Sequence, residues 1–203
     1  QRAPHLQYLA EQVMALLRGD FTRLAVSMPP RHGKSCFVSQ YFPTWYLGRN
    51  PEARVIVCSY GRELAKQWSL AARDLFATYA PQVFGVDTQA RASVVDWPVF
   101  RDRKRTGGGY YAVGKGGALT GKGCDLLILD DLIKDAAEAN SASQRRHCWE
   151  WLQSVPLTRL EPGGRVLFVS TRWHHDDPIA RLEAQAGAGG EPWRFVNLPA
   201  VAG

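Results

Sequence analysis

The chain has 203 residues, which is enough for one sizeable domain. Hydrophobic residues make up 45% and charged residues 22%, and these fractions exclude a disordered tail, a collagen-like fibre and a coiled coil. The net charge of +6 permits an anionic partner such as nucleic acid but does not require one. No apolar run approaches the ~20 residues that cross a bilayer, so we expect no membrane contact. The four cysteines form no CxxC pair, which argues against a zinc site.

Apolar patterns along the chain predict helices alternating with short buried strands. Helical spacing predicts a first helix over 6–17, and a short apolar run predicts a strand over 24–28. Further strands are predicted at 54–60, 126–129, 165–170 and 194–198, with helices over 64–76 and 143–152. Near-continuous apolar strands between helices indicate an α/β fold, with a mostly parallel central sheet flanked by helices on both faces.

The segment 87–125 fits this pattern less well, because it is basic and rich in glycine. We expect a β-rich excursion here, with mobile loops at the carboxyl edge of the sheet. Its cationic cluster is the best candidate in the sequence for contacts with a DNA phosphate backbone, and the alternative is a solvated loop. The cluster consists of Arg101, Arg103, Lys104 and Arg105.

The segment 29–35 joins a predicted strand to a predicted helix and contains Gly-Lys-Ser. This is the context of a phosphate-binding loop, because backbone N–H groups and a helix N-terminus stabilise phosphate there. Gly33 allows close backbone approach, Lys34 can reach the β- and γ-phosphates, and Ser35 can bind Mg²⁺. Arg31 could neutralise the γ-phosphate in the transition state, or be an exposed loop cation. The predicted nucleotide-binding residues of the loop are Arg31, His32, Gly33, Lys34 and Ser35.

Two adjacent acids follow the apolar strand predicted at 126–129. A nucleotide hydrolase needs a carboxylate at the end of a buried strand to hold its metal, and Asp130 fits that role. Asp131 could orient or deprotonate the attacking water, and Glu138 is a rival candidate for the base. The alternative is that both acids cap the next helix or form a turn.

Polar residues end the strand predicted at 165–170. Hydroxyl groups beside a nucleotide site can pass the loss of the γ-phosphate to another part of the molecule, and Ser170, Thr171 and Arg172 are the candidates. Further on, the His174–Asp177 run could suggest a metal site. The Asp177-Pro178 pair instead favours a helix N-cap followed by proline in the first turn.

Taken together, these motifs resemble the large terminase subunit of tailed bacteriophages. The matching segments are Met-Pro-Pro-Arg-His-Gly-Lys-Ser at 28–35, Gly-Ala-Leu-Thr-Gly-Lys-Gly at 117–123, Leu-Leu-Ile-Leu-Asp-Asp at 126–131 and Ser-Thr-Arg-Trp-His at 170–174. The resemblance implies a P-loop NTPase fold of the additional-strand, catalytic-glutamate (ASCE) class. It also implies Mg²⁺-dependent ATP hydrolysis that drives double-stranded DNA into a procapsid. A helicase-like ATPase and a hydrolysis-defective, nucleotide-gated binding module are the alternatives.

The resemblance also implies roles for single residues. The loop arginine of the family corresponds to Arg31, its P-loop lysine to Lys34 and its metal-binding acid to Asp130, whereas Asp131 stands where the family has its catalytic glutamate. Gln7 matches a glutamine that contacts adenine. Lys122 stands where some members carry an arginine that acts on the ATP of a neighbouring subunit. The coupling motif of the family falls on Ser170, Thr171 and Arg172.

By the same resemblance, residues 1–203 form a single ATPase domain, and the nuclease domain that normally follows it is absent from this sequence. The implied partners are double-stranded DNA, the portal protein and the small terminase subunit, with a homo-oligomeric ring assembled on the procapsid. The implied location is the cytoplasm of a bacterial host, transiently at the portal.

Overall fold

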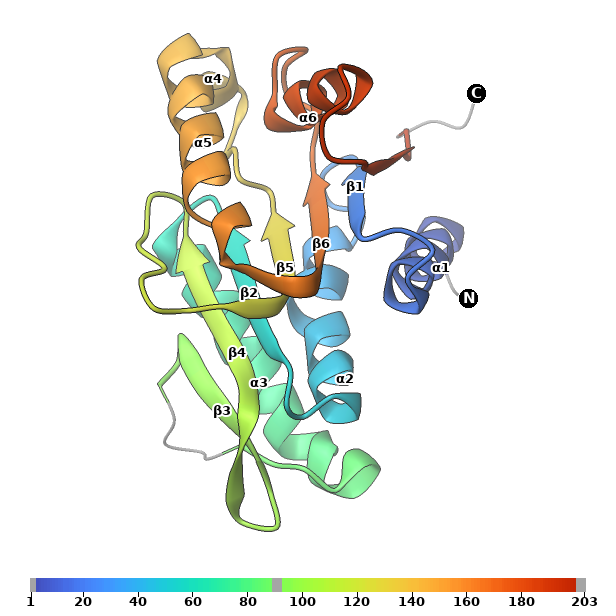
Figure 1. The fold of residues 1–203 in the computed structure, drawn as a ribbon, viewed down its shortest axis with the longest axis vertical. Helices are drawn as coiled ribbons and strands as arrows, with labels where there is room; N and C mark the ends of the chain where they lie inside the picture. The colour runs from blue at the N-terminus through green and yellow to red at the C-terminus, as the bar shows by residue number, and fades with distance from the viewer. Residues whose placement is uncertain (1–2, 89–92, 200–203) are drawn as a thin grey trace.

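The computed structural model describes residues 3–88 and 93–199, which form a seven-stranded sheet with helices on both faces (Figure 1). The strand order is β3-β4-β2-β5-β6-β1-β7, and every neighbouring pair is parallel except β3 with β4. The strands are β1 Arg23–Ser27, β2 Arg54–Ser59, β3 Asp96–Arg101, β4 Lys104–Gly114, β5 Cys124–Asp130, β6 Leu160–Ser170 and β7 Arg194–Asn197. The predicted α/β architecture is therefore confirmed. Strand β6 lies between β1 and β5, which is the additional strand expected of the ASCE class.

The helices divide into two layers, and each layer covers one hydrophobic core. They are α1 Pro4–Arg18, the π-helix η1 Cys36–Tyr41, α2 Phe42–Arg49, α3 Arg62–Phe84, α4 Ala136–Asn140, α5 Ala142–Ser154, the 3₁₀-helix η2 Leu157–Arg159 and α6 Pro178–Gly187. On β2, Val55 and Val57 pack toward α1, α2 and α3, whereas Ile56 and Cys58 pack toward α5 and α6. Burial on both faces explains why the central strands are apolar at successive positions. None of the described helices is long and apolar enough to cross a membrane.

The first part of the glycine-rich stretch, through Gly114, forms strand, and the rest lies in the connection 115–123. Strand β4 pairs in parallel with β2, so that Gly109 lies opposite Arg54 and Gly114 opposite Ser59. The β-rich excursion is thus confirmed for the described part of 87–125, and residues 89–92 lie outside the described residues.

The expectation that the basic residues lie at the carboxyl edge of the sheet is wrong. Arg101, Arg103, Lys104 and Arg105 form the β3–β4 turn, at the end of the sheet where β4 and β2 begin (Figure 1). The reason is topological: β3 runs antiparallel to β4, so the turn between them falls at the amino end of the parallel strands. The amino-acid composition of this segment does not indicate that β3 runs antiparallel to β4.

The connection from β4 to β5, residues 115–123, returns across the sheet without a helix. Leu119 of this connection is buried beside α5, and Trp151 Nε1 donates a hydrogen bond to the Gly117 carbonyl at 3.1 Å. This segment therefore packs on the α5 side of the sheet, beside Val113 of β4.

Candidate nucleotide site

The phosphate loop leaves the end of β1 and enters η1, as the sequence predicts. Both Arg31 (φ 63°) and Gly33 (φ 78°) adopt left-handed backbone conformations, which are uncommon for a residue with a side chain such as arginine. A Cβ atom on Gly33 would lie 3.3 Å from Leu6 Cδ1, so helix α1 packs closely against the loop. Strain of this kind in a loop is typical of functional sites.

Four predicted residues from two distant segments meet at the carboxyl end of β5. Ser35 Oγ donates a hydrogen bond to Asp130 Oδ1 at 3.0 Å, across 95 positions of sequence. Lys34 Nζ lies 2.7 Å from Asp131 Oδ2. Lys34 is only 5% exposed and Asp130 is fully buried, so the ion pair and the hydrogen bond are largely shielded from water. The structure thus brings together the predicted phosphate loop and the predicted acidic pair.

The electrostatic environment of Asp130 fits a metal ligand. Burial, and then the negative charge of Asp131, raise the pKa of Asp130 from 3.8 to about 7, against the opposing effect of hydrogen bonds from Ser39 and Ser35 and the charge of Lys34. Burial and the Asp131 charge therefore disfavour the ionised form of this carboxylate, and a bound cation would favour it. On the neighbouring strand, Ser59 pairs with Asp130 in register, and its buried Oγ has no hydrogen-bond partner within the described residues.

The donor set also fits Mg²⁺, which prefers oxygen ligands and uses few protein carboxylates when substrate phosphates and water complete its shell. The Asp130 carboxylate and the Ser35 hydroxyl are such ligands. Across residues 3–88 and 93–199, no group of three or more His, Cys, Asp or Glu side chains gathers to bind a metal. A cation here would take its other ligands from the nucleotide and from water.

Asp131 is held in a defined position. Its backbone is left-handed (φ 45°), and its N–H donates to the Val169 carbonyl at 3.0 Å. Its Oδ1 accepts a hydrogen bond from the Thr171 N–H at 2.8 Å. Glu138 instead forms an ion pair with Lys115 and accepts a hydrogen bond from the Lys134 N–H at 2.7 Å. Of the two candidates for the base, only Asp131 contacts the phosphate loop lysine.

The remaining predicted loop contacts lie at the surface. The Arg31 side chain is exposed, and the His32 ring Nδ1 lies 2.8 Å from the Pro30 carbonyl. His5 Nε2 lies 3.1 Å from the His32 carbonyl oxygen, which ties the start of α1 to the loop. Gln7 is exposed and donates to Glu11 at 3.3 Å. Its contact with adenine therefore stays a prediction.

The predicted coupling residues connect three parts of the site. The Ser170 carbonyl accepts a hydrogen bond from the Met28 N–H at 3.0 Å, directly before the phosphate loop. Thr171 contacts Asp131 as described above, and Arg172 Nε lies 2.6 Å from Asp177 Oδ2. Asp177 caps helix α6 by accepting from the Ala180 N–H at 2.9 Å. The predicted N-cap is thus confirmed.

Comparison with known proteins places this chain in a family. The family model for the terminase large subunit, T4likevirus-type, N-terminal, matches residues 26–202. The chain belongs to the terminase large-subunit family. It is 26% identical over 166 residues to the terminase large subunit of Enterobacteria phage T3, covering 79% of this chain and 28% of that relative. The HK97 bacteriophage large terminase shares the fold, with a TM-score of 0.57 at 14% identity, covering 91% of this chain and 37% of that one.

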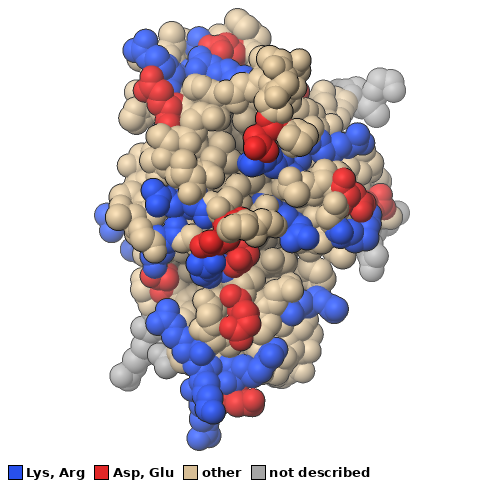
Figure 2. Space-filling view, viewed as in Figure 1, with Lys and Arg blue, Asp and Glu red and all other residues tan. Residues whose placement is uncertain are grey.

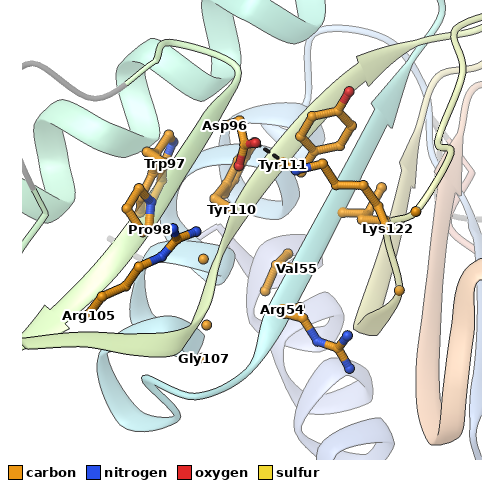
Figure 3. A pocket seen from close by; sticks show the side chains of 15 residues that line it. Arg54, Val55, Asp96, Trp97, Pro98, Arg105, Gly107, Tyr110, Tyr111 and Lys122 are labelled. Atoms are coloured by element: carbon orange, nitrogen blue, oxygen red, sulfur yellow. Dashed lines mark hydrogen bonds and ion pairs between the residues drawn. The ribbon is translucent and has the colours of Figure 1, made fainter.

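Lys122, predicted to act on a neighbouring subunit, lies outside the cluster of Lys34, Ser35, Asp130 and Asp131 in its own terminase domain. Its Nζ is 2.6 Å from Asp96 Oδ2 and 4.6 Å from the ring centroid of Tyr111 (Figure 3). A pocket of about 190 Å³ opens beside it, on the sheet face crossed by residues 115–123. A role for Lys122 in a neighbouring subunit stays a prediction.

The predicted DNA-binding residues of the terminase domain form an exposed positive patch. Arg101, Arg103, Lys104 and Arg105 are all exposed, and among the described residues none of the four takes part in an ion pair. Figure 2 shows Lys and Arg side chains gathered at the lower end of the molecule, with an acidic side chain beside them, where Figure 1 draws the β3–β4 turn. The patch lies at the opposite end of the sheet from Asp130.

Ser39 is a site residue that the sequence analysis missed. It is fully buried, and its Oγ donates a hydrogen bond to Asp130 Oδ2 at 2.8 Å. No motif marks it. The only indication in the sequence is its spacing of four residues from Ser35, which places both hydroxyls on one side of a helical segment.

Proposed function

We propose that this domain is the ATP-hydrolysing motor of a phage DNA-packaging terminase. The observation that carries the proposal is the cluster of Lys34, Ser35, Asp130 and Asp131 at the carboxyl end of β5. Ligand sites of open α/β sheets lie outside the carboxyl ends of their strands, as this cluster does. Membership of the terminase family supports ATP as the nucleotide and DNA as the cargo.

In the proposed mechanism, the phosphate loop and Lys34 orient the triphosphate of ATP. Ser35 and Asp130 would hold Mg²⁺, which neutralises charge on the β- and γ-phosphates when bound. Asp131 orients the attacking water and accepts its proton, and Arg31 stabilises negative charge at the γ-phosphate. Ser170, Thr171 and Arg172 pass the change at the γ-phosphate to helix α6, through the contact between Arg172 and Asp177.

The proposal is tested by phosphate release from ATP in Mg²⁺, with Lys34→Ala as the blank. We expect wild-type turnover well above that of the variant, because only the wild type carries an ammonium group in the phosphate loop. EDTA should reduce the wild type to the level of Lys34→Ala. Wild-type turnover indistinguishable from Lys34→Ala would overturn the proposal.

The basic turn is the proposed contact with DNA. Each phosphate contact that is lost should make the dependence of log affinity on log salt shallower by about 0.9. We therefore expect the triple replacement of Arg101, Arg103 and Arg105 by serine to reduce the magnitude of that slope by up to about 3. The reduction should be the same for DNA duplexes of different sequence, because phosphate contacts do not read the bases. Fluorescence anisotropy of labelled duplex DNA across a salt series measures the slope.

A matched control for the basic turn removes exposed cations elsewhere. Lys66 on α3 and Arg146 on α5 are exposed, and their replacement by serine should leave most of the slope in place. An unchanged slope in the triple variant would exclude the turn as the DNA contact.

The proposed partners are the portal protein and the small terminase subunit, with the motor domains arranged as a ring on the procapsid in the bacterial cytoplasm. The chain spans 28% of the phage T3 relative, so DNA cleavage is assigned to no residue of this chain.

A further inference from the structure

Two serines hold the two oxygens of the Asp130 carboxylate. Ser35 donates to Oδ1 at 3.0 Å and Ser39 donates to Oδ2 at 2.8 Å. Ser39 belongs to the π-helix η1, which directly follows the phosphate loop. Short π-helical turns occur frequently at functional sites. In the proposed mechanism Ser35 would turn to the metal, and Ser39 is the donor that would then keep the Asp130 carboxylate oriented.

A buried tyrosine in turn fixes Ser39. Tyr110 Oη donates a hydrogen bond to the Ser39 carbonyl at 2.9 Å, and Tyr110 is 1% exposed. Trp97 stacks on the Tyr110 ring with a centroid distance of 5.0 Å and an interplanar angle of 9°. Trp97 Nε1 donates to Ser69 Oγ at 3.1 Å, so the stack is anchored to helix α3. Tyr110 therefore has little freedom to move away from Ser39.

This arrangement has the form of an outer hydrogen-bond shell around a metal ligand. Such partners orient a ligating carboxylate, and their loss typically weakens metal binding 10- to 100-fold. The buried Tyr110 hydroxyl contacts the backbone carbonyl of Ser39, and the buried Ser39 hydroxyl contacts Asp130. An apolar core at these positions would need neither group.

We propose that Ser39 and Tyr110 are positioning residues for Asp130, and that they set the affinity of the site for Mg²⁺ with nucleotide. Ser39 acts on Asp130 directly, and Tyr110 acts through Ser39. The inference rests on the proposed function, because it assumes that Asp130 binds the metal of a bound nucleotide.

The test measures binding of a fluorescent ADP analogue to the whole chain, in EDTA and in a Mg²⁺ titration. For Ser39→Ala we expect unchanged affinity in EDTA and about 10-fold weaker binding of Mg²⁺ to the nucleotide complex. Tyr110→Phe should weaken Mg²⁺ binding in the same direction by a smaller factor. It keeps the ring that stacks on Trp97 and loses only the hydroxyl. Thr44→Val removes a buried hydroxyl of helix α2 that does not contact Asp130, and we expect it to behave as wild type.

Three outcomes separate the possibilities. Equal Mg²⁺ affinity in the wild type and Tyr110→Phe, with Ser39→Ala also equal or unfolded, would overturn the positioning role. A loss as large in Thr44→Val would also overturn it, because the effect would then follow from any buried hydroxyl. A wild type that binds no nucleotide would instead overturn the proposed function itself.

Discussion

Asp130→Asn is expected to lower ATP turnover on the order of 1,000-fold, the upper scale for removal of one group that stabilises charge in a transition state. The variant keeps the shape of the side chain and removes its negative charge. The loss should appear in kcat at saturating Mg²⁺, because an amide is a poor ligand for this cation beside the phosphates. Phosphate-release kinetics over a Mg²⁺ titration measure it. Turnover within a few-fold of the wild type would remove Asp130 from the metal site.

The same substitution should stabilise the protein in EDTA at pH 8. The pKa of Asp130 is about 7 in the folded chain and near 3.8 in the unfolded chain. Between pH 3.8 and about pH 7, the folded state therefore binds more protons at this group than the unfolded state does. The free energy of unfolding therefore falls as pH rises from about 4 to about 7, and stays low above pH 7. An uncharged Asn avoids this loss, which amounts to at most about 4 kcal/mol.

Urea unfolding of wild type and Asp130→Asn at pH 5 and pH 8 measures this difference. The difference in the free energy of unfolding between the two proteins should be larger at pH 8 than at pH 5. Asp125→Asn on the same strand is a suitable control, because Asp125 is partly exposed and pairs with Arg54. A gap that does not change with pH would contradict a raised pKa at Asp130.

Asp131→Asn is expected to reduce kcat by about 100- to 10,000-fold, the contribution typical of a general base. Nucleotide affinity should stay equal or increase, because the variant releases the Lys34 ammonium from its ion pair. Asp131→Glu should restore part of the turnover. Single-turnover ATP hydrolysis, together with ADP binding, separates the two effects.

Glu138→Gln is the matched comparison for the base. We expect its turnover to stay within a few-fold of the wild type, since Glu138 is held by Lys115 and the Lys134 N–H. If Glu138→Gln lost turnover while Asp131→Asn retained it, the base would be Glu138.

Much of the sheet could be predicted because its central strands are apolar on both faces. The expected runs at 54–60 and 126–129 correspond to β2 and β5, and the loop between β1 and η1 lies where the Gly-Lys-Ser sequence predicts. The meeting of Ser35 with Asp130 also follows from topology, because the carboxyl ends of parallel strands share one edge.

The position of the basic turn and the role of Ser39 could not be predicted in this way. The direction of β3 depends on an antiparallel pairing, and glycine and arginine in β4 give no periodic pattern. Ser39 acquires its role from a contact 91 positions away, and a lone serine in a helix carries no mark of such a contact. The ion pair between Lys34 and Asp131 likewise joins side chains that lie far apart in the sequence, and no local pattern indicates it.

In the proposed mechanism, the ion pair between Lys34 and Asp131 would turn substrate recognition into an exchange of partners. The Lys34 ammonium group would turn from the Asp131 carboxylate toward the phosphates, so the binding of ATP would replace one electrostatic contact with another. Lys34 would then add little to the net affinity for the nucleotide, and the Asp131 carboxylate would be free to accept a proton from water. Lys34 would thus keep Asp131 paired, and unable to act as a base, until the triphosphate binds.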